Sequence, residues 1–217
     1  MYDLHIHSLL SDGVLLPSEI AVRYMALGFK TIAITDHCDY SNIKPNIAAI
    51  LEFTSHWPKN LKINVLPGIE LTHLPLEQFY PLAKYSRSQG IKIIVAHGQT
   101  LTEPVIKGTN LATLAADIDI LAHPGLITDE EVRLAKKNNI FLEVTCRQGH
   151  KVTNAHVVEK AIELGAKLIL NTDAHAPEDI IAPAEIIEIA KNSGLNSSQI
   201  DKIYQDVGKF LQRREAE

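Results

Sequence analysis

The first seven residues, Met1-Tyr2-Asp3-Leu4-His5-Ile6-His7, have the alternating pattern of a β-strand that begins the fold. Successive side chains of a strand point to opposite faces, so His5 and His7 lie on the same face. Asp12 follows within the short turn Ser11-Asp12-Gly13. Two imidazoles and a carboxylate in this arrangement indicate the first part of a metal site, which the rest of the chain would have to complete.

Strand and helix signals alternate from one end of the chain to the other, without a linker or a low-complexity segment. About seven such β-α units predict a single α/β domain over residues 1–217, in which parallel strands close into a (β/α) barrel about one unit short of eight. Two helices, at about 177–192 and 197–213, are expected to complete it. An open doubly wound sheet is the alternative, although neither GxGxxG nor GxxxxGK[ST] follows any predicted strand.

The bulk properties narrow the class of protein. The net charge of −5 argues against a broad, non-specific nucleic-acid binder, so we do not expect long nucleic acid as a partner. The two cysteines, Cys38 and Cys146, are far apart in sequence and favour a reducing compartment. No apolar run approaches the ~18 residues that a membrane span needs. We therefore expect a cytoplasmic enzyme without a membrane partner.

Polar residues collect where the predicted strands end, which in a (β/α) barrel is where the chemistry takes place. They are His5, His7, Asp12, His37, Glu70, His97, His123, Asp173 and His175. Alternation along the strands directs these side chains toward one mouth of the barrel. Neutral imidazoles and carboxylates are good ligands for divalent transition metals, so the set predicts a centre of two or three ions, in which Glu70 could bridge two.

Four other polar residues are expected to have structural roles. His56, His73 and His156 do not fall at predicted strand ends. Asp36 lies next to His37 in sequence and therefore has the opposite orientation along the strand.

The sixth predicted strand supplies no metal ligand, and the segment after it carries positive charge instead. Arg147 has a planar guanidinium group that suits bidentate recognition of phosphate. His150 and Lys151 add positive character just before a predicted helix N-terminus. We therefore predict Arg147, His150 and Lys151 as substrate-binding residues.

Taken in order, these motifs resemble those of the PHP family, named for polymerase and histidinol phosphatase. The matching motifs are His5-Ile6-His7, Ser11-Asp12-Gly13, Thr35-Asp36-His37, Gly68-Ile69-Glu70, His97-Gly98, His123-Pro124 and Asp173-Ala174-His175. The resemblance implies a distorted, TIM-like (β/α)7 barrel with a trinuclear centre of zinc, manganese or iron. All nine ligand positions are filled, as in an active member of the family.

The resemblance also implies a role for each residue. One metal would be held by His5, His7, Glu70 and Asp173, a second by Glu70, His97 and His123, and a third by Asp12, His37 and His175. Glu70, Asp173 and His175 would be catalytic together with a metal-bound hydroxide that attacks phosphorus in line.

These features predict a metal-dependent phosphoesterase that hydrolyses a small phosphomonoester. The segment after the sixth strand resembles that of stand-alone histidinol-phosphatase-like proteins, so histidinol phosphate is a candidate substrate. The alternative is a phosphodiesterase or exonuclease that acts on nucleotides or short oligonucleotides. An amidohydrolase ranks lower, because Thr35-Asp36-His37 and Glu70 favour the PHP pattern, and the complete ligand set disfavours a metal-binding module without catalysis. The sequence leaves the native metal and the oligomeric state open.

Overall fold

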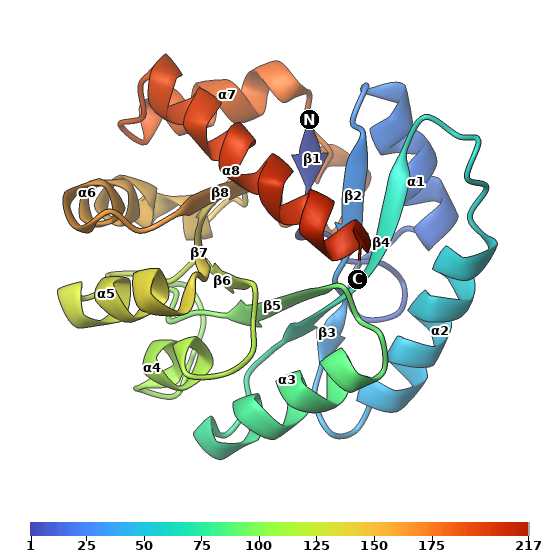
Figure 1. The fold of residues 1–217 in the computed structure, drawn as a ribbon, viewed down its shortest axis with the longest axis horizontal. Coiled ribbons are helices and arrows are strands. Elements are labelled where there is room, and N and C mark those ends of the chain that lie inside the picture. The colour runs from blue at the N-terminus through green and yellow to red at the C-terminus, as the bar shows by residue number, and fades with distance from the viewer. Residues whose placement is uncertain (217) are drawn as a thin grey trace.

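A computed structural model describes residues 1–216 as a parallel sheet that curves into a barrel, with helices around it (Figure 1). The principal strands are β1 (Tyr2–Asp3), β2 (Thr31–Ile34), β4 (Asn64–Leu71), β5 (Ile93–His97), β6 (Ile120–Ala122), β7 (Phe141–Thr145) and β8 (Leu168–Asn171), and they pair in this order. The two-residue strand β3 (His37–Cys38) follows β2 and pairs with β4. The predicted single-domain α/β barrel is therefore confirmed.

The helices follow the strands as the alternating pattern predicts. They are α1 (Pro17–Ala26), α2 (Ile43–His56), α3 (Phe79–Ser88), α4 (Thr109–Leu114), α5 (Asp129–Asn138), α6 (Asn154–Leu164), α7 (Pro183–Asn192) and α8 (Ser197–Ala216). Short 3-10 turns occur at Leu76–Gln78, His150–Thr153 and Pro177–Asp179. The final helix reaches Ala216, three residues beyond its expected end, and Glu217 lies outside the described residues.

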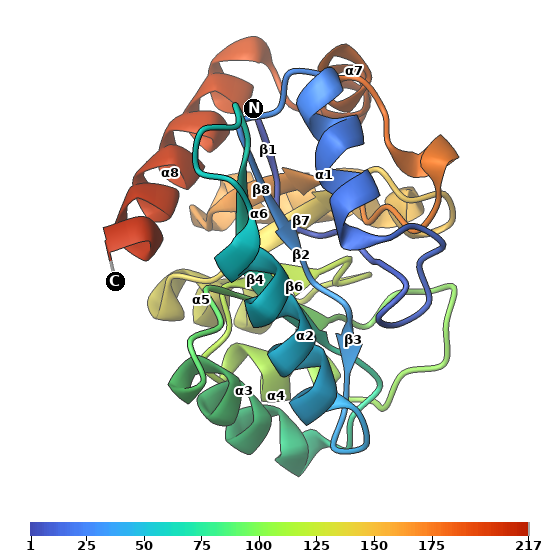
Figure 2. The same ribbon diagram turned by 90° about the vertical axis from the view of Figure 1, so that its right-hand side faces the viewer.

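The barrel closes where the continuation of β1 meets the continuation of β8, and the two strands lie side by side (Figure 2). Ile6 and Ala174 form a parallel bridge, and the backbone N–H of His7 donates to the carbonyl of Ala174 over 2.8 Å. The buried carboxylate of Asp3 accepts a 2.6 Å hydrogen bond from the Thr172 hydroxyl. This seam brings the first and last predicted site motifs together.

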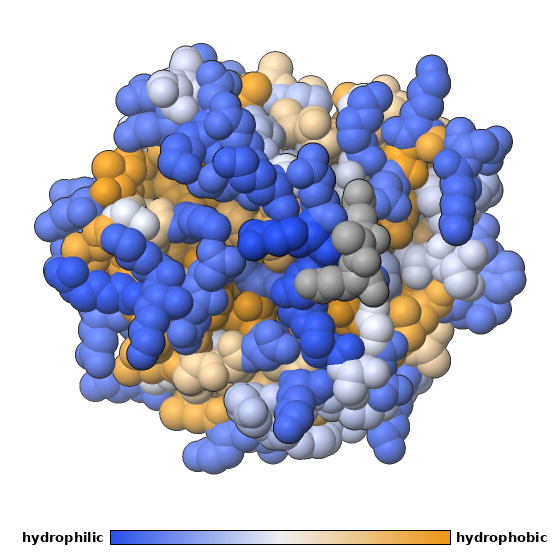
Figure 3. Space-filling model, viewed as in Figure 1, coloured by the Kyte–Doolittle hydropathy of each residue, from blue (hydrophilic) through white to orange (hydrophobic). Residues whose placement is uncertain are grey.

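Helix α8 crosses the end of the barrel where the strands begin (Figure 1). Tyr204 of α8 packs edge-on against Tyr2 with ring centroids 5.3 Å apart, and Phe210 packs against Phe141 at 5.4 Å. Seen from this side, the surface is mostly hydrophilic with apolar residues between the helices (Figure 3). With this end covered, the opposite end, where the strands finish, is left to form the site.

Two further observations bear on the expectations from composition. Cys38 and Cys146 are both free thiols, and burial raises the pKa of Cys38 to about 12. Within residues 1–216, no helix has both the length and the apolar character needed to cross a bilayer.

Candidate metal centre

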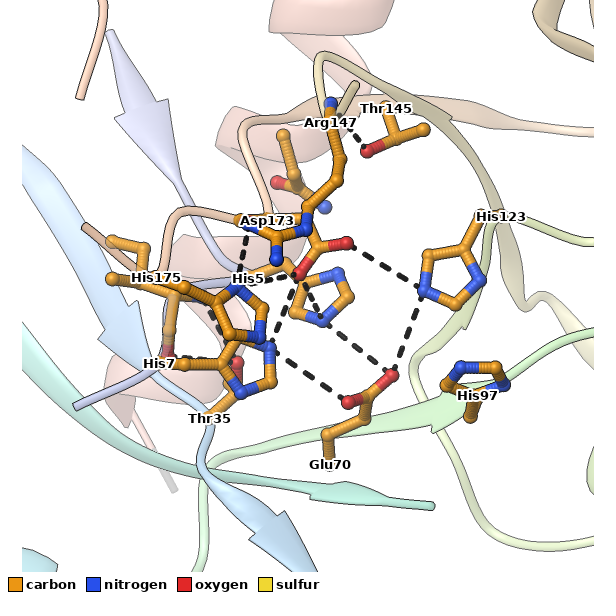
Figure 4. Close-up of polar contacts among 12 residues, drawn as sticks. His5, His7, Thr35, Glu70, His97, His123, Thr145, Arg147, Asp173 and His175 are labelled. Atoms are coloured by element: carbon orange, nitrogen blue, oxygen red, sulfur yellow. Dashed lines mark hydrogen bonds and ion pairs between the residues drawn. The ribbon is translucent and has the colours of Figure 1, made fainter. Parts of the chain in front are cut away.

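The structure places the nine side chains predicted as metal ligands on or after the strands, at the end of the barrel opposite α8. Figure 4 shows seven of them, His5, His7, Glu70, His97, His123, Asp173 and His175. His5 and His7 follow β1, Asp12 lies in the next loop, His37 belongs to β3, Glu70 to β4 and His97 to β5, His123 follows β6, and Asp173 and His175 follow β8. The side chains come from elements spread over more than 170 residues of sequence, so the site exists only in the closed barrel.

The centre of the site is a buried group of imidazoles around two carboxylates. His7 Nε2 lies 3.2 Å from Asp173 Oδ1 and 3.8 Å from Glu70 Oε2. His5 Nε2 lies 3.5 Å from Glu70 Oε1 and 3.5 Å from Asp173 Oδ1. His123 Nε2 approaches Asp173 Oδ2 at 3.7 Å. These separations bring ligand atoms of four chain segments around one small volume.

Several polar atoms in this centre have no hydrogen-bond partner although they are buried. They are Nε2 of His5, both ring nitrogens of His7, Oε1 of Glu70 and Nδ1 of His123. Buried polar groups in proteins are nearly always hydrogen-bonded, because leaving one unpaired costs about 1–3 kcal/mol. Imidazole nitrogens and carboxylate oxygens that face one another without partners form the donor set that divalent transition ions prefer. The residues present therefore fit a metal centre.

The electrostatics of the centre follow from burial and close charges. Burial raises the pKa of the Asp173 carboxyl to about 7. Burial alone would raise the pKa of Glu70, but the nearby His37 and His5 lower it well below its usual value. Burial, together with the neighbouring His37 and His175, lowers the pKa of His7 well below its usual value. His7 is thus held neutral, which is the form that binds metals.

Two of the central residues have strained backbones. Asp173 has φ 55° and His123 has φ 26°, in a region that residues other than glycine rarely adopt. Such strain persists where the surrounding structure enforces it and is concentrated at functional sites.

A second group lies at the outer edge of the centre. Asp12 Oδ2 lies 3.2 Å from His175 Nε2 and 3.4 Å from His37 Nε2, and its other oxygen lies 3.7 Å from His7 Nδ1. The turn that positions Asp12 needs glycine next to it, because a Cβ on Gly13 would overlap the backbone carbonyl of His7. This close approach explains why glycine follows Asp12 in the Ser-Asp-Gly motif.

His97 has close neighbours that the sequence interpretation did not assign to the site. Its Nε2 lies 2.9 Å from Glu103 Oε2, and the same oxygen lies 3.2 Å from His73 Nε2. Glu103 was not predicted, and His73 was expected to be structural. Among the described residues, His97 groups with these two, whereas the close group that contains His123 also contains His5 and Asp173.

Glu143 supports the centre from β7 and was also missed as a functional residue. Its Oε1 lies 2.8 Å from His5 Nδ1 and accepts a 2.8 Å hydrogen bond from the Asn171 side chain. Its Oε2 accepts the backbone N–H of His123 over 3.1 Å. A carboxylate that binds the far nitrogen of a ligand histidine fixes the ring and its tautomer. The available signal was a charge within the otherwise uncharged strand Phe141–Thr145.

Asp36 has the supporting position expected for it. Its carboxylate accepts hydrogen bonds from the Ser8 backbone N–H over 2.8 Å, from the Ser8 hydroxyl over 2.7 Å and from the Ser11 hydroxyl over 2.7 Å. These bonds hold the loop that carries Asp12.

Two of the three predicted substrate-binding residues line a small pocket of about 50 Å³ at the centre. Arg147 reaches it from the segment after β7, and its guanidinium donates to Asp179 over 3.0 Å. His150 is buried, stacks on His123 with ring centroids 4.3 Å apart, and also lines the pocket. Lys151 is exposed and is not among the residues lining this pocket.

A larger pocket of about 390 Å³ adjoins the centre. It is lined by β3 and by side chains from the segments that follow β3, β4 and β5, and Asp12, His37 and Glu103 line both pockets. A substrate could therefore place one end at the centre and the rest in the larger pocket.

Comparison with known proteins identifies relatives over the whole chain. A model of the RNase P subunit p30 family matches residues 1–216. The uncharacterized protein MJ1295 of Methanocaldococcus jannaschii is 40% identical over 218 residues, which cover 98% of this chain and 99% of that protein. The DNA polymerase/3'-5' exonuclease PolX of Bacillus subtilis is 25% identical over 237 residues, which cover 98% of this chain but 41% of PolX.

The fold itself has solved counterparts. The structure of histidinol phosphate phosphatase from Lactococcus lactis, complexed with zinc, L-histidinol and phosphate, superposes with a TM-score of 0.65 and 18% identity, covering 90% of this chain and 94% of that one. This likeness confirms the predicted barrel fold, and the named relatives and fold neighbours include an exonuclease and a phosphatase. The RNase P subunit p30 match over the whole chain was not predicted from the motifs.

Proposed function

The chain belongs to the RNase P subunit p30 family, and we propose that it is a metal-dependent phosphoesterase. The observation that carries this proposal is the convergence of nine imidazole and carboxylate side chains at the barrel mouth, several with buried atoms that lack hydrogen-bond partners. Phosphoryl transfer needs dense positive charge beside a water molecule, and such a ligand set can provide it.

The proposed ligands are the nine residues predicted from the sequence, holding two to three ions of zinc, manganese or iron. Divalent ions held there would supply Lewis-acid activation of water and of the phosphoryl group. Glu70 lies between His5, His7 and His37 and is suited to join two positions. Glu70, Asp173 and His175 are the proposed catalytic residues. Asp173 and His175 line the central pocket, and Glu70 Oε1 lies 3.9 Å from Nε2 of His123, which also lines it.

Arg147 and His150 are placed to bind the phosphoryl group. Asp179 holds the Arg147 guanidinium at the wall of the central pocket, where its remaining N–H groups can donate to phosphate oxygens. Thr100 lies 2.6 Å from His150 Nδ1 and fixes the orientation of that ring. Lys151, which is exposed, would act through long-range attraction only.

A small phosphomonoester, with histidinol phosphate among the candidates, is the first proposed substrate. The central pocket is only large enough for a phosphoryl-sized group, and the 390 Å³ pocket beside it suits a small organic moiety. Polar side chains such as Asp39, Ser41 and Asn42 line the larger pocket and favour a hydrogen-bonding substrate.

Exonuclease activity on short oligonucleotides is the second candidate, and the comparisons favour it. The family to which the chain belongs is named for a subunit of RNase P, and PolX is named as a 3'-5' exonuclease. Both proposed reactions place a phosphoryl group at the same centre and differ only in what the larger pocket accepts.

The test is a hydrolysis screen of the full chain with Mn²⁺ and with Zn²⁺. The substrates are histidinol phosphate, other small phosphomonoesters, a phosphodiester and short single-stranded RNA with a 5' phosphate. Release of inorganic phosphate from the monoesters supports the first substrate class, and shortening of the RNA supports the second. The proposed function would be overturned if protein that contains bound metal hydrolyses none of these substrates with either metal.

Replacement of Arg147 by alanine is expected to raise KM for a phosphomonoester by about 10-fold or more while kcat changes much less, because a hydrogen bond to a charged group contributes roughly 1.5–3 kcal/mol. Steady-state kinetics with the Arg147→Lys variant as the charge-matched control measure this. Since lysine cannot bind phosphate bidentately, Arg147→Lys should fall between the wild type and Arg147→Ala. An unchanged KM in Arg147→Ala would show that Arg147 does not bind the phosphoryl group.

A further inference from the structure

A pocket of about 540 Å³ lies at the end of the barrel where the strands begin, away from the metal centre. Lys30 on its wall directly precedes β2, and Asn64 on its wall begins β4. The rest of the wall comes mostly from the end of α2 and from the loop that joins α2 to β4. Its volume is within the range of about 300–1,000 Å³ that small-molecule sites have. The pocket is therefore large enough for a ligand of its own.

The wall of this pocket carries positive charge without negative charge beside it. Lys30, Lys59 and Lys62 line it, and no Asp or Glu within residues 1–216 does. Elsewhere on the surface a lysine can be paired, as Lys160 is with Asp129 at 2.7 Å. In the part of the chain that the structure describes, the three pocket lysines form no ion pair with a carboxylate. In a chain whose net charge is −5, this local excess of positive charge favours an anionic ligand.

Hydrogen bonds hold the backbone that carries these lysines. The indole N–H of Trp57, the residue that caps the end of α2, donates to the carbonyl of Ile63 over 3.2 Å and so closes the loop between them. The backbone N–H of Asn64 donates to the carbonyl of Lys30 over 2.8 Å and fixes Lys30 beside this loop. A ligand would therefore have to order only the exposed lysine side chains, which lowers the entropic cost of binding.

Trp57 adds an aromatic surface to the same wall. Its ring is half-buried and packs at 48° against Phe53, with ring centroids 5.5 Å apart. Because the indole N–H is already bonded to Ile63, the ring offers a ligand its π surface. Nucleic-acid bases stack on aromatic side chains, and lysine ammonium groups bind phosphate oxygens. An aromatic ring and three ammonium groups on one wall thus match a base joined to a phosphate.

We propose that this pocket, hereafter the lysine pocket, binds a nucleoside phosphate. The base lies against Trp57, and Lys30, Lys59 and Lys62 hold the phosphate oxygens. The lysine pocket is a second site that does not depend on the reaction at the metal centre, since the two lie at opposite ends of the strands. It also differs from a simple anionic patch, because both the base and the phosphate contribute to affinity.

The test uses the fluorescence of Trp57, which is the only tryptophan in the sequence and so reports on the lysine pocket. AMP, ADP, adenosine and inorganic phosphate are each titrated into the full chain without added metal. The same titrations with His7→Ala prevent hydrolysis at the proposed metal centre from consuming the ligand. AMP and ADP are expected to change the emission saturably in both proteins, and to bind at least about 10-fold more tightly than adenosine or phosphate.

The combined Lys59→Ala and Lys62→Ala variant is expected to bind AMP about 10-fold or more weakly, because it loses charge-assisted hydrogen bonds to phosphate. Lys44→Ala combined with Lys84→Ala is the matched control. These two lysines are also exposed, on α2 and α3, and lie outside the lysine pocket, so this variant should bind AMP as the wild type does.

Three results would each overturn the proposal. The first is no saturable change of Trp57 emission with AMP or ADP, and the second is AMP binding no tighter than that of inorganic phosphate. The third is loss of AMP binding in folded His7→Ala, which would place the nucleotide at the metal centre. Equal weakening in the lysine-pocket variant and in its control would likewise show that general charge, and not this pocket, attracts the nucleotide.

Discussion

Replacement of His7 by alanine is expected to lower kcat for phosphoester hydrolysis by at least about 10³-fold while the barrel stays folded. His7 belongs to two of the close ligand groups, one with His5 and Glu70 and one around Asp12. Neither of its ring nitrogens has a hydrogen-bond partner, so the substitution breaks no hydrogen bond that holds the fold. Turnover in the presence of Mn²⁺ or Zn²⁺ measures the first effect, and circular dichroism with thermal unfolding measures the second.

Asp173→Ala is the companion variant, since Asp173 Oδ1 lies 3.2 Å from His7 Nε2 across the seam. His56→Ala, on the outer surface of α2, is the control and should retain full activity. Unchanged turnover in a folded His7→Ala protein would refute the proposed metal centre. If His7→Ala does not fold, His7→Asn keeps a polar side chain at the position and permits the same comparison.

Replacement of Glu143 by glutamine is expected to weaken metal affinity or activity by about 10–100-fold, although Glu143 itself lies outside the proposed ligand set. The carboxylate holds His5 Nδ1 at 2.8 Å and the backbone N–H of His123 at 3.1 Å. An amide keeps the shape but removes the charge, and its NH₂ group replaces one acceptor oxygen, so the side chain can no longer accept from both the His5 ring and the His123 backbone N–H. Competition with a zinc chelator measures the affinity, and kcat is measured at saturating metal.

Glu131→Gln is the matched control for Glu143→Gln. Glu131 is also buried, and its carboxylate accepts the Thr128 N–H at the start of α5, away from the metal centre. This control should alter thermal stability without changing zinc affinity. If Glu143→Gln also binds zinc as tightly as the wild type, the supporting role of Glu143 is wrong.

The elements of the fold were predictable because they depend on local patterns. The segment Thr128-Asp129-Glu130-Glu131 has the order of a capping box, and the structure contains that box at the start of α5. Helix α4 is harder to predict, because the polar residues Thr109 and Asn110 at its start are both good helix caps. Gly108 is the N-cap instead, and the Asn110 side chain donates to the carbonyl of Pro124. That hydrogen bond is made to a loop outside the helix, so the local sequence around Asn110 cannot predict it.

The same distinction applies to the site. The alternation of side chains along a strand is fixed by the backbone, and it was enough to place the predicted strand-end ligands at the mouth of the barrel. Glu103 could not be placed in this way, since it lies in an irregular segment whose path depends on tertiary contacts. Glu143 lies on a predicted strand, but its partner His5 is 138 residues earlier in sequence. Periodicity shows which face a side chain takes, and it does not show which distant group the side chain meets.

If the proposed metal centre is occupied, the seam between β1 and β8 would tie the persistence of this protein to the supply of metal. His5 and His7 lie in the segment that continues β1, and Asp173 and His175 lie in the segment that continues β8. An ion bound across the seam binds the folded chain and not the unfolded one, which adds about 4 kcal/mol of stability when free metal exceeds Kd 1,000-fold. Under metal starvation the seam loses this contribution, and the chain would open there and become a substrate for proteases. The lifetime of the protein would then report the metal status of its cell.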